Sequence, residues 1–205
     1  MQRAFDQFKD NMTYVTELDT LFIHLKETLK LPNDLSDLLR AEWVYAVSAL
    51  DKLIHELIRI GMLEAFQGTR PRTAKFLAFN VSLSTHTLIT SSTPISIPPP
   101  EYFFEQEVMQ KHKTLSFQDP DKIADGLSLI WGEQHKWQTI AISMGIDKSD
   151  LTTRLRNIIS RRNQIVHEAD LDLLTGLRNS ISKVDIDFVV GFINTLSEQI
   201  FNAVK

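Results

Sequence analysis

The chain has 205 residues, a net charge of −4 and an apolar content of 43%, and it contains no cysteine. This length fits a single domain with a proper core, and the absence of cysteine excludes disulfides, zinc ribbons and cysteine nucleophiles. The acidic balance restricts any nucleic-acid binding to a local basic patch. The charged start, MQRAFDQFKD, predicts no secretory signal, and no run of about 18 apolar residues predicts a spanning helix. We therefore expect a cytoplasmic protein without membrane contact.

Two long helices are predicted in the first third of the chain. Apolar residues spaced three and four apart extend over residues 5–29 and again over residues 35–57. This spacing gives each helix one apolar face. Pro32 ends the first helix, and Asn33 or Asp34 is the expected N-cap of the second. The short connection between them predicts an antiparallel helix hairpin.

The middle of the chain differs in composition. It is rich in Ser, Thr and Pro and predicts a loop-rich insertion at about 70–100, with a helical turn or a short extended piece at most. The helical spacing then resumes and predicts helices at about 101–117, 120–130, 133–144, 150–168 and 182–204.

Two of these later helices carry sequence signals for their first turn. Asp119 precedes Pro120, which suits the first position of a helix, and Ser182 with Asp185 has the spacing of a capping box. The predicted fold class is therefore all-α, a helical bundle in a single domain of residues 1–205.

The helix predicted at about 150–168 contains a cation within its apolar face. This face follows Leu151, Leu155 and Ile158, and the next position in the same direction is Arg162. A guanidinium in an apolar face needs a carboxylate, a phosphate or a wet interface. Arg162 is therefore a candidate functional residue.

His167 follows five residues later, about 140° away around an ideal helix but within reach of a long arginine side chain. Asn163 lies nearly in line with His167 and is expected to orient the imidazole or to contact a ligand. A plainer interpretation stays open, in which Arg162 forms an ion pair and His167 interacts with the helix dipole. An Arg-x4-His pair arises by chance about 0.3 times in such a chain, so the spacing alone does not decide.

The surrounding sequence resembles the signature of the HEPN superfamily. The run Arg161–Asp170, RRNQIVHEAD, has Arg, Asn and then His near the end of a core helix, and Ala41–Arg59 looks like the early core helix of the RiboL-PSP-HEPN branch. The resemblance implies a helical fold that dimerises and places two Arg-x4-His motifs face to face. Many such proteins are ribonucleases of toxin, antiviral or CRISPR-related systems, and some are inactive binding modules. Carried over, Arg162 and His167 would be the catalytic pair, with Asn163 as polar support.

Other charged residues are candidates for a supporting role. Arg154, Arg156 and Arg161 form with Arg162 a local basic cluster, which predicts an RNA-binding track. Taken singly, each of the first three is better explained as a solvated side chain that pairs with a nearby Asp or Glu.

The second helix offers further candidates. Asp51 and His55 have the spacing to pair on one face, with a surface pair as the alternative role. Glu42 or Asp51 is expected to hold Arg162 when no RNA is bound. The histidines outside these groups, His112 among them, are expected to face solvent.

These residues together with the resemblance predict a metal-independent endoribonuclease that uses the 2'-hydroxyl of RNA, and the resemblance implies a composite Arg/His site at a homodimer interface. We expect no cofactor and no metal, because the sequence contains no HExxH, no spaced ligand set and no Gly-rich phosphate loop. The expected partners are RNA, a second copy of the chain and an antitoxin or regulatory protein. Two alternatives stay open: an inactive module that binds RNA, a nucleotide or a protein, and a plain helical oligomerisation domain.

Overall fold

The structure, a computed structural model, describes residues 1–172 and 174–205. Its regular elements are helices, and the described residues contain no strand beyond an isolated bridge between Leu171 and Arg178. In chain order the elements are α1 (Gln2–Ile23), η1 (His24–Thr28), α2 (Ser36–Gln67), α3 (Ala74–Leu77), α4 (Leu83–Ser91), α5 (Pro100–His112), α6 (Pro120–Leu127), α7 (Lys136–Met144), α8 (Lys148–His167) and α9 (Lys183–Val204). The predicted all-α class is confirmed.

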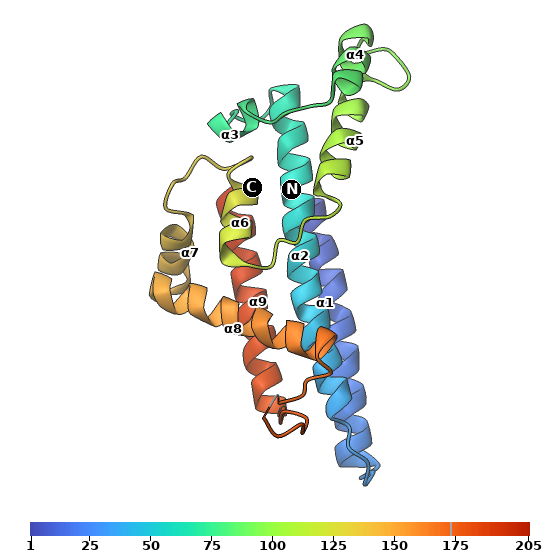
Figure 1. Cartoon of the computed structure of the whole chain (residues 1–205), viewed down its shortest axis with the longest axis vertical. Coiled ribbons are helices and arrows are strands. Elements are labelled where there is room, and N and C mark those ends of the chain that lie inside the picture. Colours follow the sequence, from blue (N-terminus) through green and yellow to red (C-terminus); the bar gives the residue numbers. More distant parts are fainter. Residues whose placement is uncertain (173) are drawn as a thin grey trace.

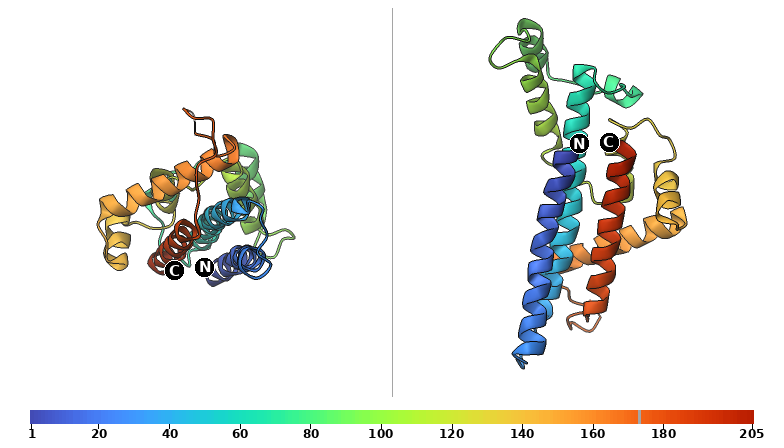
Figure 2. Two further views of the ribbon diagram at one scale, coloured as in Figure 1. Left: turned by 90° about the horizontal axis from the view of Figure 1, so that it is seen from below. Right: turned by 180° about the vertical axis from the view of Figure 1, so that it is seen from behind.

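Three long helices form the frame of the molecule. Helices α1, α2 and α9 lie side by side along the long axis, with α1 running opposite to the other two (Figures 1 and 2). The predicted antiparallel hairpin of the first two helices is confirmed. Its turn differs in detail, because Leu35 takes the N-cap position of α2, and Asp34 instead accepts a hydrogen bond from the backbone N–H of Ser36 at 2.9 Å.

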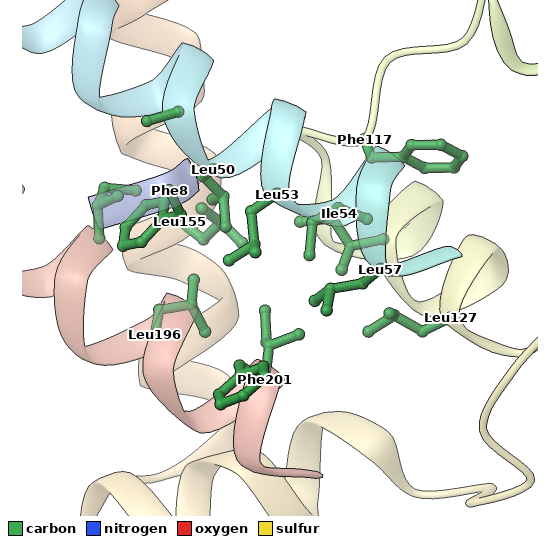
Figure 3. Close-up of a cluster of buried hydrophobic side chains, with 14 of the residues drawn as sticks. Phe8, Leu50, Leu53, Ile54, Leu57, Phe117, Leu127, Leu155, Leu196 and Phe201 are labelled. Carbon is green, nitrogen blue, oxygen red and sulfur yellow. The ribbon is translucent and has the colours of Figure 1, made fainter. Parts of the chain in front are cut away.

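The core lies where these helices meet α6 and α8. Figure 3 shows Phe8, Leu53, Leu127, Leu155 and Leu196 converging from α1, α2, α6, α8 and α9. Each is at most 2% exposed, and burying such a side chain contributes about 1.5–3 kcal/mol. The apolar spacing in the sequence therefore reports which helix faces point inward.

Helix α8 crosses the frame at a steep angle (Figure 1). Its N-terminal part packs with α7, and its later part passes over α2. The indole Nε1 of Trp43 in α2 donates a hydrogen bond of 3.0 Å to the carbonyl oxygen of Ile158 in α8. This bond fixes the crossing point one turn before Arg162.

The segment predicted as a loop-rich insertion contains two short helices. The side chain of Thr73 caps the start of α3 by accepting a bond from the N–H of Phe76, and Ser82 caps α4. Beyond α4 the chain is open to solvent, with Ile95 and Ile97 at 92% and 100% exposure. The prediction allowed a helical turn in this segment, which α3 matches, but it missed the nine-residue α4, which is too short to show a clear apolar period.

The predicted starts of α6 and α9 are confirmed. Asp119 accepts a bond from the N–H of Asp121 with Pro120 at the first helical position. Ser182 and Asp185 form a capping box with both reciprocal bonds present. These bonds satisfy backbone N–H groups in the first turn of each helix.

Candidate functional site

Arg162 lies near the end of α8, where the apolar face leaves the core. Leu155 and Ile158 are 0% and 3% exposed, Arg162 is half-buried, and Val166 is 44% exposed. The Nε atom of Arg162 is buried without a hydrogen-bond partner, and its Nη1 donates to Oδ1 of Asn163 at 3.1 Å. Within the described residues no carboxylate forms an ion pair with this guanidinium. Arg162 therefore has unused donor capacity in a partly dry position.

His167 is the last residue of α8 and is exposed. Its imidazole makes no hydrogen bond or ion pair within the part of the chain that the structure describes. Because α8 is continuous from residue 148 to 167, the side chains of Arg162 and His167 leave the helix in directions about 140° apart. One chain alone thus presents a half-buried guanidinium and an open imidazole that diverge.

The other three arginines of α8 have carboxylate partners. Arg154 pairs with Asp150 at 2.9 Å, Arg156 with Asp121 at 3.2 Å and Arg161 with Asp170 at 2.9 Å, in each case through Nη2. The first two pairs are surface pairs, which are weak and exchange easily with other anions. The RNA-binding role of these three residues stays a prediction.

A buried network that the sequence did not reveal lies behind the motif. Oδ2 of Asp170 accepts from Nε of Arg40 at 2.6 Å and from Nη2 of Arg161 at 2.9 Å, although Arg40 and Asp170 are 130 residues apart. Arg40 is 5% exposed and Asp170 is fully buried. Arg40 and Arg161 also donate to the carbonyl oxygens of Asn179 and Ser180. The network closes the loop after α8 against α2.

The sequence contains only a weak signal for this network. Arg40 precedes Trp43 by three residues and so shares the inward face of α2. Ala169 and Asp170 follow the end of α8 in left-handed conformations, with φ 51° and 58°, which apolar spacing does not predict. A contact between such distant segments cannot be inferred from helical periodicity.

Glu42 is not brought to the motif. It is 1% exposed in α2, its neighbouring charges are Asp19 of α1 and Lys183 and Asp187 of α9, and its Oε1 has no hydrogen-bond partner. Burial, followed by repulsion from Asp19, raises the pKa of Glu42 to about 7. The structure shows no ion pair between Glu42 and Arg162 among the described residues.

Asp51 and His55 lie on another part of α2. They are close, with 3.9 Å between Nε2 of His55 and Oδ1 of Asp51, but the same oxygen accepts from the backbone N–H of Phe117 at 2.5 Å. The His55 ring contacts the Phe117 ring edge-on at 4.6 Å. The pair therefore anchors the segment before α6, and no ion pair joins Asp51 to Arg162 in the described structure.

The prediction for His112 was wrong. This side chain is 7% exposed and contacts the rings of Phe79 and Phe117. Burial, with a smaller contribution from His55, lowers the pKa of His112 to about 4. Its imidazole is therefore neutral at pH 7 and behaves as an aromatic core residue.

The fold and the motif define a class: an all-α bundle with an Arg-Asn-x3-His motif at the end of a core helix. In a scan of protein families, the model described as RiboL-PSP-HEPN matches residues 10–205. The chain belongs to this family. Comparisons with curated proteins and with solved structures gave no match. Among the described residues no helix is long and apolar enough to cross a bilayer, and no cluster of three or more His, Asp or Glu side chains has the geometry of a metal site.

Proposed function

We propose that the protein is a metal-independent endoribonuclease of a toxin or antiviral defence system, with Arg162 and His167 as its catalytic pair. Family membership supports the coarser statement, an RNase or a nucleotide-binding module. The finer statement depends on the chemistry of the α8 motif.

The observation that carries the proposal is that the guanidinium of Arg162 has a hydrogen-bond donor without an acceptor. Its Nε is buried without a partner, whereas Arg161, the next residue of the same helix, is satisfied by a buried carboxylate. Leaving a donor of a charged group unpaired costs about 1–3 kcal/mol or more. A phosphate oxygen would supply the missing acceptor, and a guanidinium binds two such oxygens in a fork.

The reaction needs only proton transfer and stabilisation of charge. The 2'-oxygen attacks the adjacent phosphorus, its proton passes to a neutral imidazole, and the P–O5' bond breaks as the 5'-oxygen receives a proton from an imidazolium. The products are a 2',3'-cyclic phosphate and a 5'-hydroxyl. His167 presents an exposed imidazole at the end of α8 and is the candidate group for either proton transfer. Arg162 would stabilise the phosphorane charge.

A second copy of the chain completes the site in this proposal. Because the two side chains of one motif diverge around α8, one copy does not enclose a phosphate. A two-fold axis near the end of α8 would place two guanidinium and two imidazole groups around one phosphodiester. We expect sedimentation at twice the chain mass of 23.5 kDa.

The test is RNA cleavage in the presence of a chelator. Wild-type protein is compared with Arg162→Ala and His167→Ala, and with Arg3→Ala as the matched control, since Arg3 is an exposed arginine of α1 outside the predicted RNA-binding track. We expect each motif variant to lose at least about 100-fold in rate, and the control to stay within a few-fold. Unchanged cleavage in both motif variants would refute the assignment.

His167 is exposed, and its side chain makes no hydrogen bond within the described residues. This favours one alternative, an inactive module in which Arg162 anchors an anion. In that case RNA binds without cleavage, Arg162→Ala weakens binding, and His167→Ala has little effect. A plain oligomerisation domain would show neither RNA effect, and Arg162→Ala would dissociate the dimer.

A further inference from the structure

A hollow of about 390 Å³ lies between α8 and the N-terminal half of α9. Its walls include Trp43 of α2, Asn157 and Ile158 of α8, and Val184, Phe188 and Val189 of α9. This volume is within the usual range for small-molecule clefts, about 300–1,000 Å³. It is large enough for one nucleobase with part of its ribose.

The hollow has an aromatic surface beneath a cation. Phe188 is 51% exposed, and the guanidinium of Arg154 lies 5.7 Å from the centre of its ring. Arg154 also forms a surface ion pair with Asp150 at 2.9 Å. The guanidinium lies over the ring, and a flat base stacks on an aromatic face or on the plane of an arginine guanidinium.

Polar groups at the hollow fit the edge of a base. The amide of Asn157 is exposed and makes no hydrogen bond within the described structure, so it offers both a donor and an acceptor. The carboxylate of Asp185, another wall residue, already accepts from the N–H of Ser182 at 2.9 Å. The hollow therefore combines apolar walls with an unused amide and presents no unpaired carboxylate.

The hollow is one helical turn from the motif. Ile158 precedes Arg162 by four residues, which corresponds to about 6 Å along α8 and about 40° around it. Arg161 follows Asn157 by the same interval. A base in the hollow would thus leave its phosphate on the side where the guanidinium of Arg162 lacks a partner.

We propose that this hollow binds one nucleobase of the RNA strand next to the scissile phosphate, stacked on Phe188 and hydrogen-bonded by Asn157. The inference rests on the proposed function, because it takes single-stranded RNA as the ligand. The inference goes beyond the proposed function by assigning base recognition to α9 and to the middle of α8. The occupant is a base because the hollow offers an aromatic ring and a guanidinium, and because it adjoins an arginine that lacks an acceptor.

The experiment uses a fluorescent single-stranded 2'-O-methyl oligonucleotide, which cannot be cleaved, and a series of the same oligonucleotide with one abasic site moved along it. Affinities are measured for wild-type protein, Phe188→Ala and Phe188→Tyr. The control is Tyr14→Ala, which removes a similarly exposed ring (55%) from α1. Phe188 is half-exposed, so its replacement is compatible with folding.

We expect an abasic site at one position to weaken wild-type binding by roughly 10-fold, the size of one stacking interaction. Phe188→Ala should weaken binding of the intact strand by a similar factor and abolish the abasic effect, since the two changes remove the same contact. Phe188→Tyr should restore both, and Tyr14→Ala should match wild type.

An abasic effect of equal size in Phe188→Ala would overturn the inference, as would an intact strand that fails to bind wild-type protein. Loss of the dimer in Phe188→Ala without any change in the abasic effect would show instead that the hollow is a protein contact. The outcome is independent of cleavage. Cleavage that depends on Arg162, with an abasic effect independent of Phe188, would refute the base site and leave the proposed function intact.

Discussion

At the scale of single residues, the arginines around α8 separate into two kinds. Arg40 and Arg161 converge on the buried carboxylate of Asp170, whereas Arg162 has a buried Nε without a partner. The first kind stabilises the fold. The second kind is a cost to the fold, which is usual for a group that is kept for binding or catalysis.

This contrast predicts that the two kinds of residue contribute differently to the free energy of unfolding. Asp170→Ala removes the buried carboxylate that Arg40 and Arg161 share and leaves Arg40 only the exposed Asp37 as an ionic partner, so it should lower the free energy of unfolding by about 3–5 kcal/mol. Arg162→Ala removes an unsatisfied donor and should change it by no more than about 1 kcal/mol. Urea denaturation followed by circular dichroism measures both, and a larger loss in Arg162→Ala than in Asp170→Ala would contradict the division.

At the scale of the helices, the sequence predicted most where an element is long and amphipathic. The faces of α1, α2, α8 and α9 follow from apolar spacing because several turns repeat the same signal. The position of Arg162 at the end of one such face was predictable for the same reason. The short helix α4, which begins at the cap Ser82, was not predictable in this way.

The N-terminus of α9 gives a prediction at this scale. Ser182 accepts from the N–H of Asp185 in a capping box, and the first turns of α9 carry Val184 and Phe188 beside α8. Ser182→Ala should lower stability by about 1 kcal/mol and increase amide exchange over the first turn of α9. Hydrogen exchange with mass spectrometry measures this, with Ser91→Ala, at the exposed end of α4, as the control. Equal exchange in the two variants would contradict the role of the cap.

At the scale of the whole molecule, tertiary contacts decided what the sequence left open. Glu42 faces α1 and α9, Asp51 holds Phe117, and Asp170 reaches Arg40, and each placement depends on segments far apart in the chain. Helical periodicity assigns a side chain to a face but does not say which helix covers that face. The candidate acidic partners of Arg162 were therefore the weakest part of the prediction.

Two buried titratable groups predict the pH dependence of stability. The pKa of Glu42 is about 7 in the folded state against an ordinary value of 4.5, so the folded state holds more protons between these values and stability falls as pH rises through them. The pKa of His112 is about 4 against 6.5, so the unfolded state holds more protons there and stability rises with pH from about 4 to 6.5. The two contributions oppose each other in wild-type protein.

Replacing one of these two groups should leave the pH dependence of stability that the other group causes. Glu42→Gln should be less stable at pH 5 than at pH 7, and His112→Phe should be more stable at pH 5 than at pH 7, each by about 2 kcal/mol. Denaturation midpoints at the two pH values measure the difference. Parallel pH profiles for the two variants would show that these groups do not set the dependence.

The central claim, that Arg162 and His167 cleave RNA through its own 2'-hydroxyl, is tested most directly by the chemistry of the product ends. Wild-type protein is incubated with RNA in excess chelator, and the termini are identified by mass spectrometry, with His167→Ala in parallel. The account predicts 2',3'-cyclic phosphate and 5'-hydroxyl ends that disappear in the variant. Fragments with 3'-hydroxyl ends that form only when magnesium is added, or that form equally in His167→Ala, would contradict it.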